Sequence, residues 1–169
     1  MSGAALVWLR RDLRLADNPA LAAALAACDR VVPVYVHAPD EEAPWRPGAA
    51  SDAWLHRSLT ALDAALRQLG SRLVIRRGPT LDALRALAAE TGTTRVHWNR
   101  LYEPALVARD KGIEEALREA GLVADSCNAG LLNEPWQVTR DDGGPYRVFT
   151  PFWKACQRIG IDAPPVAAP

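Results

Sequence analysis

Apolar residues follow two different spacings along this chain. Short continuous apolar runs, such as Ala4 to Leu9, are typical of strands that are buried on both faces of a sheet. Longer segments carry leucines at steps of three and four, which is the spacing of one face of a helix. The two patterns alternate along most of the chain, so the sequence predicts strands and helices in alternation.

The alternation predicts the fold class. Strands are expected at 4–9, 31–37, 73–76, 95–99 and 122–127. Helices are expected at 19–28, 51–69, 79–91, 104–120 and 149–159, with a loop at 38–50. Strands that alternate with helices of this length favour right-handed parallel crossovers. We therefore predict an α/β fold: a five-stranded parallel, Rossmann-like open sheet with helices on both faces, in three α/β/α layers.

Local signals indicate where helices begin and end. Asp17-Asn18-Pro19 is typical of a helix start, with Asp or Asn as N-cap and Pro at the first helical position. We favour a cap over a ligand role for Asp17. Gly70 stands where the C-cap of the long helix belongs.

The end of the chain differs in composition from the rest. Residues 163–169 are only alanine, proline and valine, which excludes a helix or a central strand and favours an extended linker. The remaining composition, 49% hydrophobic and 24% charged, is ordinary for one globular domain. We expect a domain at 1–160 and a linker at 161–169 that leads to a further domain.

Charge and cysteine content exclude several classes of function. Twenty basic and 20 acidic side chains give a net charge of zero, whereas a domain that grips DNA alone needs a basic excess. Three scattered cysteines fit a reducing cytoplasm, and no apolar run is long enough to cross a bilayer. We predict a cytoplasmic protein that does not bind a membrane, with no metal site, because no histidine has ligand partners at a useful spacing.

Charged and aromatic residues follow the first and the fourth predicted strands. They occupy Arg10 to Asp17 and Asn99 to Pro104. In a doubly wound sheet, the ligand crevice opens between such loops where the strand order reverses. We therefore expect the loops to converge on one ligand site. The same residues allow a second interpretation, in which Arg10, Asp12, Arg14 and Glu103 pair with one another and tie the loops together.

Histidines and tryptophans carry less information. His37, at the end of the second strand, is a candidate ligand contact, with a purely structural histidine as the alternative. His97, inside an apolar strand, is expected to be structural. Trp8 and Trp98 in strands, and Trp54 on a helix, are predicted to be packing residues. No residue in the chain is assigned a catalytic role.

Five sequence segments resemble one known family. Arg10 to Leu21 follow the pattern R-x-D-L-R-x-x-D-N-x-A-L, which is similar to the N-terminal signature of the photolyase/cryptochrome family. Further segments resemble that family in the same order, at 35–39, 42–59, 99–104 and 146–152. The resemblance covers nearly the whole chain.

The resemblance implies a specific division of labour. Members of the family have an N-terminal α/β domain that holds an antenna chromophore, followed by a larger helical domain that binds FAD. Light collected by the antenna reaches reduced flavin, which donates an electron to a pyrimidine dimer flipped out of DNA. The chain is thus expected to be the antenna domain of a deoxyribodipyrimidine photolyase. Damaged DNA would be bound through the missing flavin domain, which would dock on the region from Trp136 to Trp153.

Two other functions stay open at this point. A cryptochrome blue-light receptor would share this domain. A freestanding nucleotide-binding module is also an α/β domain, although the chain has no glycine-rich phosphate loop after its first strand. ATP binding by the chain would favour the module.

The antenna chromophore is expected to be methenyltetrahydrofolate or a deazaflavin. Folate-binding members carry an Asn-Glu pair where this chain has Ala105 and Leu106, and deazaflavin-binding members carry an Asp where it has Ala38. Both departures leave the choice open. The residues expected to bind the cofactor are Arg10, Asp12, Arg14, His37, Asn99, Arg100 and Glu103.

Overall fold

The computed structural model describes residues 3–160 and 165–169, which belong to two compact units. The first unit runs to Ala129 and includes Val166–Pro169, and the second spans Gly130–Pro165. Of the expected linker at 161–169, residues 161–164 lie outside the described residues. No helix in the described part of the chain is long and apolar enough to cross a bilayer.

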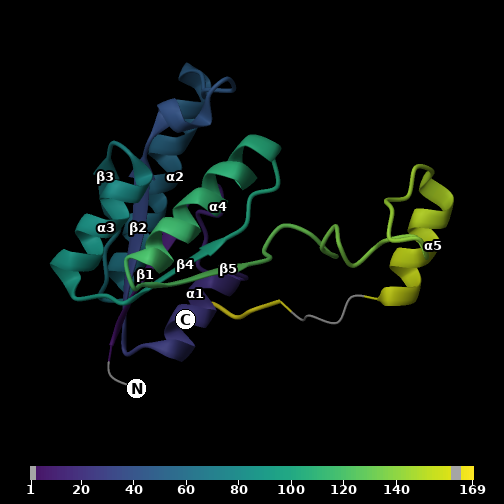
Figure 1. Ribbon diagram of the computed structural model, residues 1–169. Helices are drawn as coiled ribbons and strands as arrows, with labels where there is room; N and C mark the ends of the chain where they lie inside the picture. The colour runs from purple at the N-terminus through teal and green to yellow at the C-terminus, as the bar shows by residue number, and fades with distance from the viewer. Residues whose placement is uncertain (1–2, 161–164) are drawn as a thin grey trace. The chain divides into compact units, whose positions relative to one another are not determined.

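The first unit is built on a five-stranded, all-parallel sheet (Figure 1). The strands are β1 (Ala4–Leu9), β2 (Arg30–His37), β3 (Val74–Arg77), β4 (Arg95–Asn99) and β5 (Val123–Cys127). Their order is β3-β2-β1-β4-β5, and the register places Trp8 between Val34 and Trp98. The order reverses at β1, so its carboxyl end borders the crevice in which sheets of this type bind ligands.

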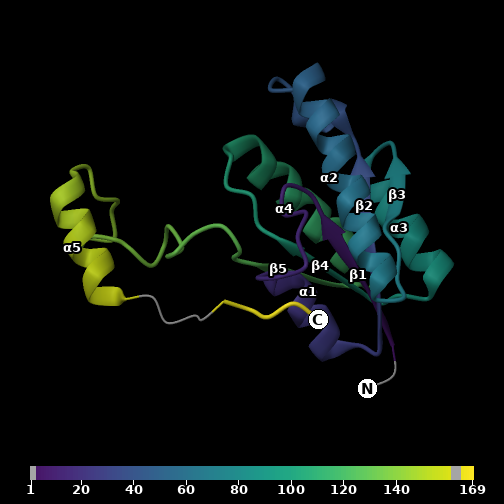
Figure 2. The same ribbon diagram turned by 180° about the vertical axis from the view of Figure 1, so that it is seen from behind.

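Two layers of helices cover the sheet, which confirms the predicted three-layer fold (Figures 1 and 2). Ala5, Val7 and Leu9 face the core under α1 (Pro19–Ala27) and α2 (Ala49–Gln68). Leu6 and Trp8 face the core under α3 (Thr80–Thr91) and α4 (Pro104–Glu119). Because both faces of β1 are covered, all six of its residues are buried, which explains its continuous apolar run.

The segment expected to be a loop at 38–50 contains a short 3₁₀ helix, η1 (Pro39–Glu42). The Glu41 carboxylate accepts hydrogen bonds from the Thr80 amide at 2.7 Å and the Thr80 hydroxyl at 2.6 Å. Glu41 therefore caps α3 from outside that helix and ties η1 to it. The long helix α2 begins at Ala49, two residues before the predicted Ser51.

Asn18 caps α1, and the interpretation of Asp17 as the cap is wrong. The Asn18 side chain is buried and accepts a hydrogen bond from the Leu21 amide at 3.1 Å. Asp17 has a φ of +50°, a conformation that Asp tolerates better than most residues. Its amide donates to the Val166 carbonyl at 2.7 Å, and its carboxylate accepts from the Val166 amide at 3.3 Å. Asp17 thus holds the C-terminal residues on the first unit.

The second unit contains helix α5 (Phe149–Ile159). Exposed Phe149 and Trp153 lie one turn apart on this helix and stack with a ring-centroid distance of 6.2 Å. Upstream, a turn closed by Arg140 and Asp142 brings Thr139 next to Pro145. The unit therefore exposes aromatic residues over the region from Trp136 to Trp153.

His97 makes the stability of the fold depend on pH. Its side chain is 3% exposed, and neither ring nitrogen has a hydrogen-bond partner within the described residues. Burial lowers the pKa of His97 from its usual 6.5, although nearby Asp125 opposes this shift. Below about pH 6.5 the unfolded chain therefore binds a proton at His97 that the folded chain does not bind. The free energy of unfolding consequently falls as the pH is lowered through this range.

We expect the free energy of unfolding to fall between about pH 8 and about pH 5.5, and His97→Leu to reduce that fall. Urea titrations at several pH values measure the free energy of unfolding of each protein. His56→Leu is the matched control, because His56 is exposed on α2. Identical pH dependence in the wild type and both variants would contradict the assignment.

Candidate functional site

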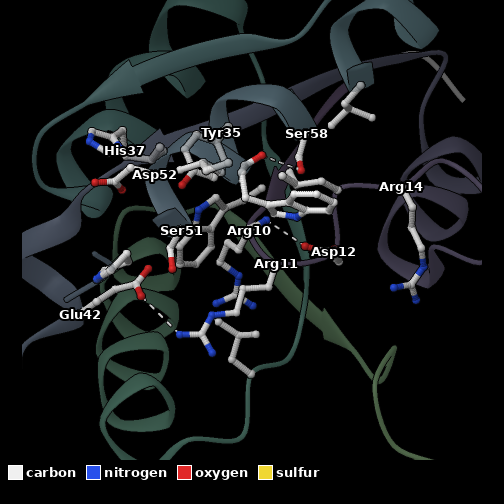
Figure 3. Close-up of a pocket in the computed structure, with 18 of the residues that line it drawn as sticks. Arg10, Arg11, Asp12, Arg14, Tyr35, His37, Glu42, Ser51, Asp52 and Ser58 are labelled. Carbon is white, nitrogen blue, oxygen red and sulfur yellow. Dashed lines mark hydrogen bonds and ion pairs between the residues drawn. The ribbon is translucent and has the colours of Figure 1, made fainter. Parts of the chain in front are cut away.

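A cavity of about 1300 Å³ opens at the carboxyl ends of β1 and β2 (Figure 3). Its walls come from the segment after β1, the end of β2, η1 with the loop after it, and α2. Ligand cavities usually measure about 300–1000 Å³, so this one is large enough for a cofactor. It includes the segment after β1, as expected, but it lies on the β2 side of that strand and takes only Leu101 from the loop after β4.

Aromatic rings dominate one part of the wall. Trp45 and Trp54 both line the cavity and are 84% and 72% exposed, and Tyr35 contributes a half-buried ring. Exposing two indoles to water is unfavourable, and such rings are typical of sites that stack a planar ligand. The expectation that Trp54 is a packing residue is wrong, whereas Trp8 and Trp98 are buried in the core as predicted.

Polar groups of α2 and η1 share the wall with these rings. Ser51, Asp52 and Ser58 project from α2, and Glu42 comes from η1 (Figure 3). Burial raises the pKa of the Tyr35 hydroxyl, and the carboxylates of Glu42 and Asp52 raise it further. Tyr35 therefore stays protonated at neutral pH and can donate a hydrogen bond into the cavity.

Arg10 is buried where β1 ends. Its guanidinium pairs with Asp110 of α4, donates to the Asn99 carbonyl, and lies 4.3 Å from the centre of the Trp8 ring. Burial lowers the pKa of Arg10, and the Asp110 carboxylate opposes that shift. Arg109 adds a second contact to Asp110 at 2.8 Å. Arg10 thus joins β1 to β4 and α4 at the edge of the cavity.

Asn99 is the centre of a buried hydrogen-bond network. Its amide nitrogen donates to Asp12 at 2.5 Å and to Asn18 at 2.8 Å, and its amide oxygen accepts from the Ala20 amide at 3.0 Å. The other Asp12 oxygen accepts from the Arg10 amide at 2.8 Å. These contacts fix the segment after β1 and join it to the end of β4. The side chains of Arg10 and Glu103 do not pair with one another as the second interpretation expected, because Arg10 pairs with Asp110 and Glu103 with Arg11.

Four of the seven residues expected to bind a cofactor line the cavity: Arg10, Asp12, Arg14 and His37. Arg14 lies apart from the other labelled side chains in Figure 3, and its guanidinium donates to the carbonyls of Asp17 and Ala129. The other three do not line the wall. Asn99 is enclosed in its network, Arg100 contacts Ser126 of β5, and Glu103 pairs with Arg11.

The α2 side of the cavity wall was missed by reasoning from sequence. Trp45, Ser51, Asp52, Trp54 and Ser58 belong to α2 and the loop before it. The leucine stripe of α2 identifies the face of the helix that packs on the sheet. The opposite face carries no comparable pattern, so it would ordinarily be taken as a solvent-exposed surface. The missed signal is that two tryptophans stand close to serine and aspartate within this segment.

Comparison with known proteins gives consistent matches. The family profile described as DNA photolyase matches residues 5–169. The deoxyribodipyrimidine photo-lyase of Agrobacterium fabrum is 45% identical over 94% of this chain and 32% of its own length. Cryptochrome-1 of Arabidopsis thaliana is 41% identical over 95% of this chain and 24% of its own. The chain therefore spans about a third or less of the length of these relatives.

Solved structures match over the same extent. A bacterial class III photolyase from Agrobacterium tumefaciens covers 100% of this chain with a TM-score of 0.88 and 42% identity, using 34% of its own length. An archaeal photolyase from Sulfolobus tokodaii, which holds two FAD molecules, covers 98% with a TM-score of 0.78 and 26% identity, using 37% of its own.

Proposed function

Because this chain belongs to the DNA photolyase/cryptochrome family, we propose that it is the antenna domain of a deoxyribodipyrimidine photolyase. In this role the cavity beside β1 and β2 holds a planar chromophore. The chromophore would supply light absorption and pass the excitation to a flavin bound elsewhere in the protein. The observation that carries the proposal is the large cavity with exposed Trp45 and Trp54 on its wall.

The residues present fit a conjugated ring system. Trp45 and Trp54 offer faces for stacking, and Tyr35 offers a hydroxyl donor. Leu106, which stands where folate-binding members carry the Glu of their Asn-Glu pair, is buried and is not part of the wall. The chromophore is thus held from the α2 side, which suits methenyltetrahydrofolate, a deazaflavin, or the flavin that the Sulfolobus tokodaii photolyase suggests as a light-harvesting cofactor.

Repair of pyrimidine dimers is the proposed activity of a longer protein that includes this chain. The net charge of zero supports a DNA interface outside these residues. The exposed aromatic region from Trp136 to Trp153 supports docking of a helical FAD domain on the second unit. The 41% identity to Arabidopsis cryptochrome-1 favours a blue-light receptor as the second candidate.

Replacing Trp54 with alanine is expected to weaken chromophore binding about tenfold, because the variant loses one stacking face. Fluorescence titration of the purified chain with methenyltetrahydrofolate, a deazaflavin and FAD measures the affinity. The free energy of unfolding should change by less than about 0.5 kcal/mol, since the ring is exposed. Trp136→Ala is the matched control, because it removes an exposed tryptophan of the second unit.

The proposal fails if no ring compound binds, or if Trp54→Ala and Trp136→Ala bind equally well. In the longer protein, Trp54→Ala should reduce dimer repair driven by light that the antenna absorbs. It should leave repair by directly excited flavin intact. If the longer wild-type protein does not repair dimers, the photolyase proposal is wrong and the blue-light receptor becomes the favoured function.

A further inference from the structure

A second hollow, of about 330 Å³, lies at the carboxyl ends of β2 and β3. Three of its lining residues, His37, Ala38 and Pro39, also line the large cavity. The two spaces therefore border the same stretch of chain after β2. A ligand in the large cavity would lie next to the second hollow at these residues.

Most charged groups in the hollow already have partners. Asp40 pairs with Arg46 at 3.2 Å. The Glu41 carboxylate accepts hydrogen bonds from the backbone amide and the hydroxyl of Thr80. The side chain of Arg77 makes no hydrogen bond or ion pair with any described residue, and neither does that of His37. The lining as a whole carries two acidic and two basic side chains, and the Arg77 guanidinium is the group whose N–H donors no described residue uses.

The sheet places Arg77 at this position. The register of β2 and β3 sets Arg77 directly beside His37, so both stand where their strands end. Successive side chains of a strand point to opposite faces, and the preceding Arg76 pairs with Glu90 of α3 at 2.8 Å. Next to Arg77, Gly78 has a φ of +107° and open space where a side chain would be. The backbone of Gly78 and the guanidinium of Arg77 are therefore both accessible to a ligand in the hollow.

We propose that this hollow binds the anionic tail of the ligand whose ring occupies the large cavity, with Arg77 as the charged contact. The inference rests on the proposed function. The tail chemistry is a carboxylate, as in a glutamyl chain, or a phosphate, as in a flavin nucleotide. A guanidinium binds either group through paired N–H donors.

The test compares ligands that share a ring and differ in the tail. One pair is methenyltetrahydrofolate with a short and with a longer glutamyl chain, and the other is riboflavin and FMN. Each is titrated against the wild-type chain, Arg77→Gln and Arg76→Gln. The last is the matched control, because it removes the same charge from the neighbouring position of β3.

In at least one pair, the ligand with the larger anionic tail should bind about fivefold more tightly to the wild type. Arg77→Gln should remove this excess, Arg76→Gln should keep it, and salt at about 0.5 M should suppress it. The pair that shows the excess identifies the tail as glutamyl or phosphate.

Equal affinities within both pairs, or equal effects of the two variants, would overturn the inference and leave the proposed function intact. Failure of every ring to bind the wild type would instead contradict the proposed function, and the inference with it.

Discussion

Asp110→Ala is expected to lower the free energy of unfolding by about 3–5 kcal/mol, because it leaves the buried Arg10 guanidinium without its carboxylate partner. Arg10 is 8% exposed and cannot move to water without withdrawing from Trp8 and the Asn99 carbonyl. Urea denaturation followed by circular dichroism measures the loss.

Glu115→Ala is the matched control on the same helix. Glu115 forms an exposed pair with Lys111 at 3.9 Å, so its removal should cost less than about 0.5 kcal/mol. The double variant Arg10→Met with Asp110→Leu should recover part of the stability, because the Arg10 guanidinium is then no longer buried without a partner, although Arg109 also loses Asp110. Comparable losses for Asp110→Ala and Glu115→Ala would show that the Arg10 pair is not buried in solution.

Asn99→Leu is expected to cost about 3 kcal/mol, since it leaves several buried polar groups without a partner. The Ala20 amide loses its acceptor, and the side-chain oxygens of Asp12 and Asn18 lose a donor. Leucine is close to asparagine in size, so the loss reports on hydrogen bonds rather than on a cavity. Thermal and urea unfolding measure it.

Gln68→Leu is the control for this substitution, because Gln68 is exposed at the end of α2 and its change should stay within about 0.5 kcal/mol. A cost for Asn99→Leu below about 1 kcal/mol would mean that water replaces the lost contacts and that the network does not hold the segment after β1.

The sheet could be predicted because its signal is local. The run from Ala4 to Leu9 is apolar without interruption, which is typical of a strand covered on both faces. Local signals do not give the strand order, which only the structure shows to be β3-β2-β1-β4-β5. His37 could be selected from a local signal, as a polar residue at the end of a strand.

The detailed site could not be predicted, because it depends on pairs that are distant in sequence. Asn99 looks like a ligand contact in the sequence, but Asn18, 81 residues away, engages its amide nitrogen. Trp54 looks like a core residue on a leucine-rich helix, and only the packing of α2 shows that its ring stays outside. The periodicity of a sequence does not contain these contacts, because they form only when separate helices and strands pack together.

The bond between Asp17 and Val166 has a consequence for chain topology. Residues Gly130–Pro165 leave the first unit after Ala129, and the chain rejoins that unit at Val166, where Ala168 reaches the cavity wall. The second unit is thus an insertion with both of its stems on one body. The entropy of closing such a loop changes only slowly with its length, so evolution can lengthen, shorten or exchange this insertion without rebuilding the sheet.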